Sequence, residues 1–130
     1  MATLERRDEM SSEHPIGGEE KVTEIFGGWP AFHDAEVTSI ACDRVGSEVV
    51  VTAVLEAALA RVTLRFLGCD EVKLEDFRRQ NVLFSLAISH EATKSGSAYR
   101  VVFDPSCGLD GSLRCRGIEV LEAVRKKPRA

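Results

Sequence analysis

The chain has 130 residues, of which 44% are hydrophobic and 29% are charged. This length and composition predict one soluble domain, because single domains usually contain about 100–150 residues. The 17 lysines and arginines are outnumbered by 21 aspartates and glutamates, so the net charge at pH 7 is -4. This acidic balance argues against a protein whose main partner is nucleic acid or an anionic membrane surface.

The sequence carries no signal for a membrane or for export. Its longest apolar runs, such as residues 84–88, are far shorter than the about 20 residues of a membrane-spanning helix. Residues 1–9 lack the apolar core and the small-residue cleavage site of a secretory signal. We therefore expect a cytoplasmic protein.

The four cysteines, Cys42, Cys69, Cys107 and Cys115, form no CxxC pair, and their spacing matches no zinc-binding pattern. In a reducing compartment such cysteines stay as thiols, and in apolar runs they pack as small hydrophobic residues. The sequence therefore predicts four free thiols, no metal ion and no other cofactor.

Composition divides the chain into three parts. Residues 1–18 are poor in apolar side chains and are expected to form a flexible leader, because little burial would offset the entropy lost on ordering. Residues 19–124 contain the periodic patterns of a folded domain. Residues 125–130 form a basic tail.

The folded part is expected to begin with one short amphipathic helix. Glu19-Glu20 favours a helix N-terminus, where the helix dipole attracts negative charge. Val22, Ile25 and Phe26 then fall on one helical face. Gly27-Gly28 ends the pattern, as glycine commonly does at helix C-termini.

From Trp29-Pro30 onward the hydrophobic period becomes two, which is typical of half-buried strands. The clearest case is residues 61–66, where Val62, Leu64 and Phe66 would face a core. Residues 53–60 are ambiguous, because their alanines also favour a helix. The strand candidates are residues 35–43, 48–55, 61–66, 71–75, 82–89, 99–103 and 113–120, the last with a bulge expected at Gly117.

About seven short strands in succession, with no alternating helices, predict a mainly β (α+β) fold. The expected architecture is an antiparallel sandwich or a strongly curved sheet with one short N-terminal helix. Residues 44–47 and 93–97 contain glycine and serine between strand candidates and are expected to be hairpin loops.

The segment from Phe26 to Val37 holds the candidate site residues. His33, Asp34 and Glu36 could form an acid/base pair or a partial metal site, since imidazole and carboxylate groups are the usual participants. The sequence supplies no nucleophile motif to complete a catalytic site. The favoured interpretation is that His33 and Asp34 anchor the backbone and that Trp29 and Phe32 belong to the core.

Two neighbouring polar residues, Gln80 and Asn81, precede the strand candidate that begins at Val82. Amide side chains at such a place usually bond exposed backbone groups in a turn. We therefore expect the side chains of Gln80 and Asn81 to stabilise a turn.

Three segments, read together, identify a resemblance. They are FGGWPAFHDAEV at residues 26–37, VTLRF at residues 62–66 and QNV at residues 80–82. In this order they resemble the immunity protein 50 family over about residues 19–120. The resemblance implies a small bacterial cytoplasmic protein that binds and neutralises a polymorphic toxin. It assigns no catalytic residue to this sequence. The motif residues, either structural or at an interface, are Trp29, Phe32, His33, Asp34, Glu36, Gln80 and Asn81.

Three hypotheses follow from the sequence. In the first, the protein binds a cognate protein toxin, and exposed carboxylates such as Glu71, Glu75 and Asp76 attract a basic partner. In the second, it is a small hydrolase or metal-dependent enzyme centred on His33, Asp34 and Glu36. In the third, it is a structural module that forms a homodimer through a sheet edge.

Overall fold

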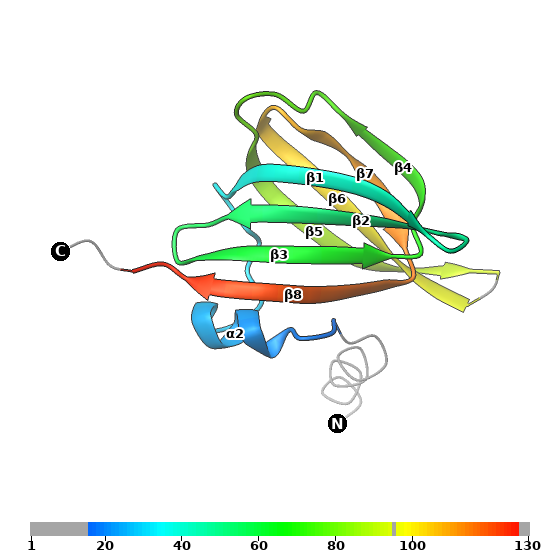
Figure 1. Cartoon of the computed structure of the whole chain (residues 1–130), viewed down its shortest axis with the longest axis horizontal. Helices are drawn as coiled ribbons and strands as arrows, with labels where there is room; N and C mark the ends of the chain where they lie inside the picture. The colour runs from blue at the N-terminus through cyan, green and yellow to red at the C-terminus, as the bar shows by residue number, and fades with distance from the viewer. Residues whose placement is uncertain (1–15, 95, 128–130) are drawn as a thin grey trace.

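The computed structural model describes residues 16–94 and 96–127. In this part of the chain one helix precedes eight strands, which form a single antiparallel sheet in the order β4-β7-β6-β5-β1-β2-β3-β8 (Figure 1). The expected mainly β class is therefore confirmed. The elements are α2 (Glu20–Phe26), β1 (Glu36–Val45), β2 (Glu48–Glu56), β3 (Ala60–Leu67), β4 (Asp70–Glu75), β5 (Val82–Thr93), β6 (Gly96–Cys107), β7 (Asp110–Cys115) and β8 (Gly117–Arg125).

Helix α2 covers one end of the sheet beside β8. Gly27 ends it in a left-handed conformation (φ 81°), and the Gly27 N–H donates to the Thr23 carbonyl at 2.8 Å. Val22 is buried, while Ile25 and Phe26 pack partly buried against the core. The expected helix and its glycine stop are both confirmed. This seven-residue helix is too short to cross a membrane, and no helix among the described residues is long and apolar enough to do so.

The three parts expected along the chain are described to different extents. Residues 1–15 of the expected leader and residues 128–130 of the expected tail lie outside the described residues. Residues 16–18 run along β8, where the Gly17 N–H donates to the Ile118 carbonyl at 2.9 Å and the Val120 N–H donates to the Gly17 carbonyl at 2.7 Å.

Strand β2 continues to Glu56, so the ambiguous stretch forms strand and turn instead of a helix. The turn closes with a hydrogen bond from the Ala57 N–H to the Ala60 carbonyl at 3.0 Å. The pairing of β2 with β3 decides the matter. Along this stretch buried and less buried residues alternate, and Ala53, Leu55 and Ala60 are the buried ones. Both expected hairpin loops, β1–β2 and β5–β6, are present.

The sheet curls so that two halves face each other across the core. In Figure 1, β1, β2, β3 and β8 run nearly parallel to the long axis, and β5, β6, β7 and β4 cross behind them on a diagonal. Phe66 of one half meets Phe103 of the other edge to face, with ring centroids 6.2 Å apart. The sheet is therefore strongly curved, which is one of the two architectures that the strand pattern predicted.

Two extended segments pass from one half of the sheet to the other. Strands β3 and β4 are separated by two residues, and β7 and β8 by the single residue Arg116. Gly117, where a bulge was expected, begins β8 at this corner. The apolar residues before and after Gly117 alternate in different phases because the chain passes from β7 to β8 at this corner. The register shift between β3 and β8 lies farther along, between Thr63 and Leu64.

Candidate functional site

The segments that carried the resemblance meet in space. The loop before β1 lies along β5: the Asp34 N–H donates to the Leu83 carbonyl at 2.8 Å, and the Leu83 N–H donates to the Ala35 carbonyl at 2.9 Å. The Val37 N–H then donates to the Asn81 carbonyl at 2.7 Å. Residues 26–37 and residues 80–82 thus build one seam that joins the two halves of the sheet. Residues 62–66 lie in β3 and supply core side chains.

The side chain of Asn81 holds this seam together through hydrogen bonds. It is 2% exposed and is the one buried polar side chain among the described residues. Its Oδ1 accepts from the backbone N–H groups of Arg78 at 2.8 Å and Leu109 at 3.0 Å. Its Nδ2 donates to the carbonyls of Arg78 at 2.8 Å and Val37 at 3.4 Å. One amide therefore connects three chain segments, whereas Gln80 is exposed.

The aromatic part of the motif packs inward. Phe32 is buried, and its ring meets the rings of Trp29 and Phe26 edge to face, with centroids 5.8 Å and 6.0 Å apart. Phe32 has a φ of 59°, which is unusual for a bulky residue and shows how tightly the seam constrains this loop.

His33 and Asp34 lie at the surface of the seam. The His33 side chain is 59% exposed, and its Nδ1 donates to the Phe84 carbonyl at 2.8 Å. The Asp34 carboxylate is 3.6 Å from the Nε2 of His33, while Glu36 lies on β1 opposite Val82. Within residues 16–94 and 96–127, no group of three or more His, Cys, Asp or Glu side chains is arranged to hold a metal ion.

His33→Ala is expected to lower the free energy of unfolding by about 0.5–1.5 kcal/mol, the net value of one hydrogen bond. Asp34→Asn is the matched control, since asparagine tolerates the left-handed backbone (φ 67°) and the change should stay within about 0.5 kcal/mol. Urea titrations measure both. Unchanged stability in His33→Ala combined with lost binding to a toxin would instead place His33 in an interface.

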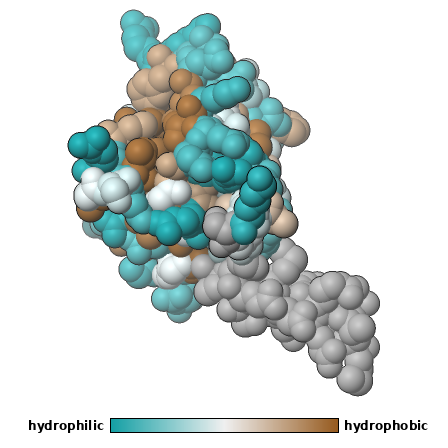
Figure 2. Space-filling model, turned by 90° about the vertical axis from the view of Figure 1, so that its right-hand side faces the viewer, coloured by the Kyte–Doolittle hydropathy of each residue, from teal (hydrophilic) through white to brown (hydrophobic). Residues whose placement is uncertain are grey.

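Beyond the seam, β1 separates from β5. The two strands pair only at Glu36 and Val82 within the described sheet, so residues 39–45 pair on one side only, with β2. Beside this open edge lies an apolar groove of about 340 Å³, lined by Ile40, Cys42, Val72, Leu74, Phe77 and Leu109. We call it the β1–β4 groove. Phe77 at its rim is 50% exposed. Figure 2 shows one side of the molecule, where hydrophobic surface is exposed between hydrophilic side chains.

A network of ion pairs covers the outer face of β4 to β7. Arg114 makes two hydrogen bonds to Asp70, at 2.9 and 2.8 Å, and Arg100 contacts Glu71 at 2.9 Å and Glu91 at 3.1 Å. The hydrogen bonds from Arg114 lower the pKa of the Asp70 carboxyl. Glu71 is therefore engaged within the molecule. Glu75 and Asp76, also expected to attract a partner, are solvent-exposed.

A family model described as Immunity protein 50 matches residues 18–125. The chain belongs to this family. The matched range contains the seam, Asn81, the open edge of β1 and the groove beside it. A search of curated proteins finds no match.

The sequence did not identify the groove as a site. Its residues come from β1, from β4 and from the loops around Phe77 and Leu109, and they are ordinary apolar residues of strand candidates. Alternation alone cannot tell which of these face a closed core and which face an open groove. The one usable signal was Phe77, an aromatic residue among charged neighbours.

Proposed function

We propose that this member of the immunity protein 50 family binds a cognate polymorphic toxin in the bacterial cytoplasm and neutralises it by occupying the toxin's surface. The partner is a protein and not nucleic acid, and the action is binding and not catalysis. The observation that carries the proposal is the open edge of β1 beside the β1–β4 groove. The family match supports the immunity role.

An open strand edge and an adjacent groove suit an extended segment of a partner. The backbone groups of residues 39–45 that face away from β2 can extend the sheet by pairing with such a segment, and the groove can take an apolar side chain from it. Arg44 and Lys73 lie close to Asp43 and Glu75 in the sequence of these strands, so the local charge is mixed. Attraction over a distance comes instead from the whole chain, whose net charge of -4 favours the approach of a basic toxin. The apolar groove then supplies affinity.

The first test compares two exposed phenylalanines. Phe77 is 50% exposed at the groove, and Phe84 is 56% exposed on β5 beside His33. Calorimetry with a cognate toxin domain should show that Phe77→Ala weakens binding by about tenfold or more. Phe84→Ala should leave the affinity within about twofold. The reverse result, with Phe84→Ala alone reducing affinity, would move the interface to the motif seam and contradict the proposal.

Cys42 offers a second test, because it is exposed within the groove. In a Cys107→Ser protein, a maleimide should label Cys42 quickly, and bound toxin should slow this labelling. The control introduces Lys21→Cys on the exposed face of α2 in a Cys42→Ser/Cys107→Ser background. Bound toxin should not change the labelling rate of this control. Equal labelling of Cys42 with and without saturating toxin would exclude the groove as the interface.

The same open edge favours a second candidate, a homodimer formed by two β1 strands pairing across a two-fold axis. Sedimentation equilibrium distinguishes the two. A monomer that forms a one-to-one complex with toxin supports the proposal, whereas a dimer that toxin does not dissociate assigns the edge to self-association.

A further inference from the structure

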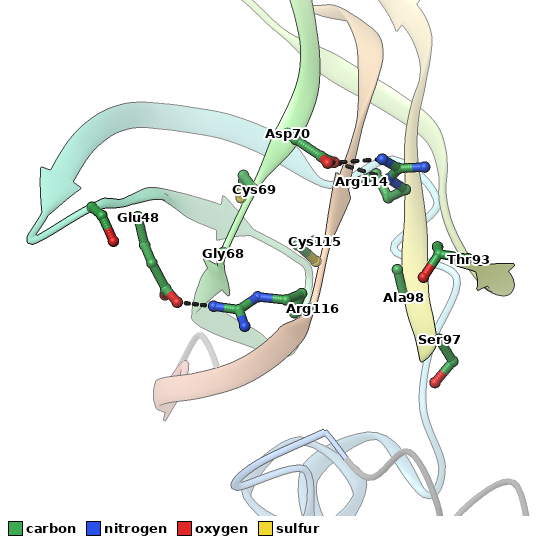
Figure 3. Close-up of a pocket in the computed structure, with 11 residues that line it drawn as sticks. Glu48, Gly68, Cys69, Asp70, Thr93, Ser97, Ala98, Arg114, Cys115 and Arg116 are labelled. Carbon is green, nitrogen blue, oxygen red and sulfur yellow. Dashed lines mark hydrogen bonds and ion pairs between the residues drawn. The ribbon is translucent and has the colours of Figure 1, made fainter. Parts of the chain in front are cut away.

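A second cavity, of about 390 Å³, lies at the corner where the chain passes between the two halves of the sheet. Its lining includes Cys69 and Cys115 together with Glu48, Asp70, Arg114 and Arg116. Figure 3 shows the two cysteines between the Asp70–Arg114 pair and the Glu48–Arg116 pair. This cavity is separate in its lining residues from the β1–β4 groove.

Strand register places the two cysteines opposite each other. On one side of the corner Leu67 pairs with Gly117, and on the other Asp70 pairs with Arg114. Counting on from either pair brings Cys69 and Cys115 to the same level, although the strand pairing is interrupted at the corner, where the Cys69 N–H donates to the Val49 carbonyl at 2.9 Å. The two thiols are in hydrogen-bond contact. A disulfide needs Cα atoms about 4.4–6.8 Å apart, and residues at the same level of adjacent antiparallel strands lie within that range.

The two thiols differ in exposure and in acidity. Cys69 is 8% exposed and Cys115 is 1% exposed, so Cys69 is the more accessible from the cavity. A hydrogen bond from the Cys115 thiol lowers the pKa of Cys69, and the same contact together with burial raises the pKa of Cys115. The Cys69 thiol also donates to the Phe66 carbonyl at 3.2 Å. Because Cys69 is the more exposed of the two thiols and lines the cavity, it is the one that a small oxidant entering there meets first.

We infer that Cys69 and Cys115 are a site of reversible oxidation, which forms an intramolecular disulfide when a small peroxide enters the corner cavity. The inference is independent of toxin binding. It adds to the expectation of four free thiols, because the structure in hand contains the reduced form.

The chemistry proceeds in two displacements. The Cys69 thiolate attacks one oxygen of hydrogen peroxide, the O–O bond breaks, and the departing hydroxide takes a proton to become water. This leaves a sulfenic acid on Cys69. The sulfur of Cys115 then attacks the sulfur of Cys69, the S–O bond breaks, and the proton of Cys115 leaves with the hydroxide as a second water. The protein loses two electrons and peroxide gains them.

The test uses the full chain with Cys42→Ser and Cys107→Ser, which removes both exposed thiols. After treatment with equimolar hydrogen peroxide, mass spectrometry should show a monomer that has lost two hydrogens and a disulfide-linked peptide containing Cys69 and Cys115. The thermal midpoint should rise on oxidation and return with dithiothreitol, because the cross-link restricts the unfolded chain. Two remaining free thiols, or disulfide-linked dimers, would overturn the inference.

A third substitution, Cys115→Ala, tests the order of events. Dimedone should then trap a sulfenic acid on Cys69, and no intramolecular disulfide should form. Circular dichroism checks that this variant is folded. If it is not, the peptide map of the protein that retains both cysteines decides the matter by itself, since it reports directly which sulfurs are joined.

Discussion

Asn81→Leu is expected to lower the free energy of unfolding by about 3–5 kcal/mol, a large part of the stability of a domain of this size. Leucine has a similar volume but no polar atoms. The substitution leaves the N–H of Leu109 and the carbonyl of Val37 without their partners in a buried place. Each unsatisfied group costs about 1–3 kcal/mol, and the seam loses the amide that connects its three segments.

Gln80→Leu is the matched control for this experiment. It makes the same chemical change one residue earlier, at an exposed side chain, so the expected effect is within about 0.5 kcal/mol. Guanidinium unfolding followed by tryptophan fluorescence measures both variants, since Trp29 packs against Phe32 in the same seam. Similar losses for the two variants would show that Asn81 does not have the structural role assigned to it.

Gly111→Ala is expected to be the second severe substitution. Gly111 lies in β7 opposite Leu74 and has a φ of 140°, a conformation that side chains rarely adopt. A Cβ atom at this position would lie 1.8 Å from the carbonyl oxygen of Lys73. Because that neighbour is backbone, β4 must move away from β7, and we expect a loss of about 3 kcal/mol or more.

Gly117→Ala is the control for Gly111→Ala. Gly117 also lies in a strand, but its nearest neighbour to a new Cβ is a side-chain carbon of Leu67 at 3.7 Å, which is an ordinary contact. Alanine there should be neutral or slightly stabilising, because it reduces the freedom of the unfolded chain. Thermal melts compare the two variants. A melting temperature for Gly111→Ala equal to that of the unaltered protein would show that β4 and β7 are not paired as described.

Local patterns in the sequence were sufficient to predict the helix and most of the strands, but the single candidate at residues 113–120 forms parts of two strands, β7 and β8. Val62, Leu64 and Phe66 alternate strictly and are all buried, and Gly27 ends α2 as its conformational freedom predicted. These features depend on residues close together in the chain. The ambiguity at residues 53–60 arose because alanine suits either state, and only the pairing of β2 with β3 decides it.

The candidate site was less predictable, because it depends on contacts between distant residues. The sequence singled out Asn81 but could not show that its amide reaches Val37 and Leu109 as well as its own turn. Nor could it place Cys69 opposite Cys115, which requires the register of two strand pairs on either side of the corner. The groove beside β1 follows from the early separation of β1 from β5, a property of sheet curvature that no short motif encodes.

The order of the strands has a consequence for the nascent chain. Strands β1, β2 and β3 pair as successive hairpins, and so do β5, β6 and β7, so each set can form while synthesis continues. The outer edge of β3 must wait for β8, whose residues, from Gly117 to Arg125, are the last of the sheet to be made. Until then the inner faces of both sets remain open to water and to other chains. We therefore expect ribosome-bound chains that stop before Gly117 to be protease-sensitive, and protection to appear in one step once β8 has left the exit tunnel.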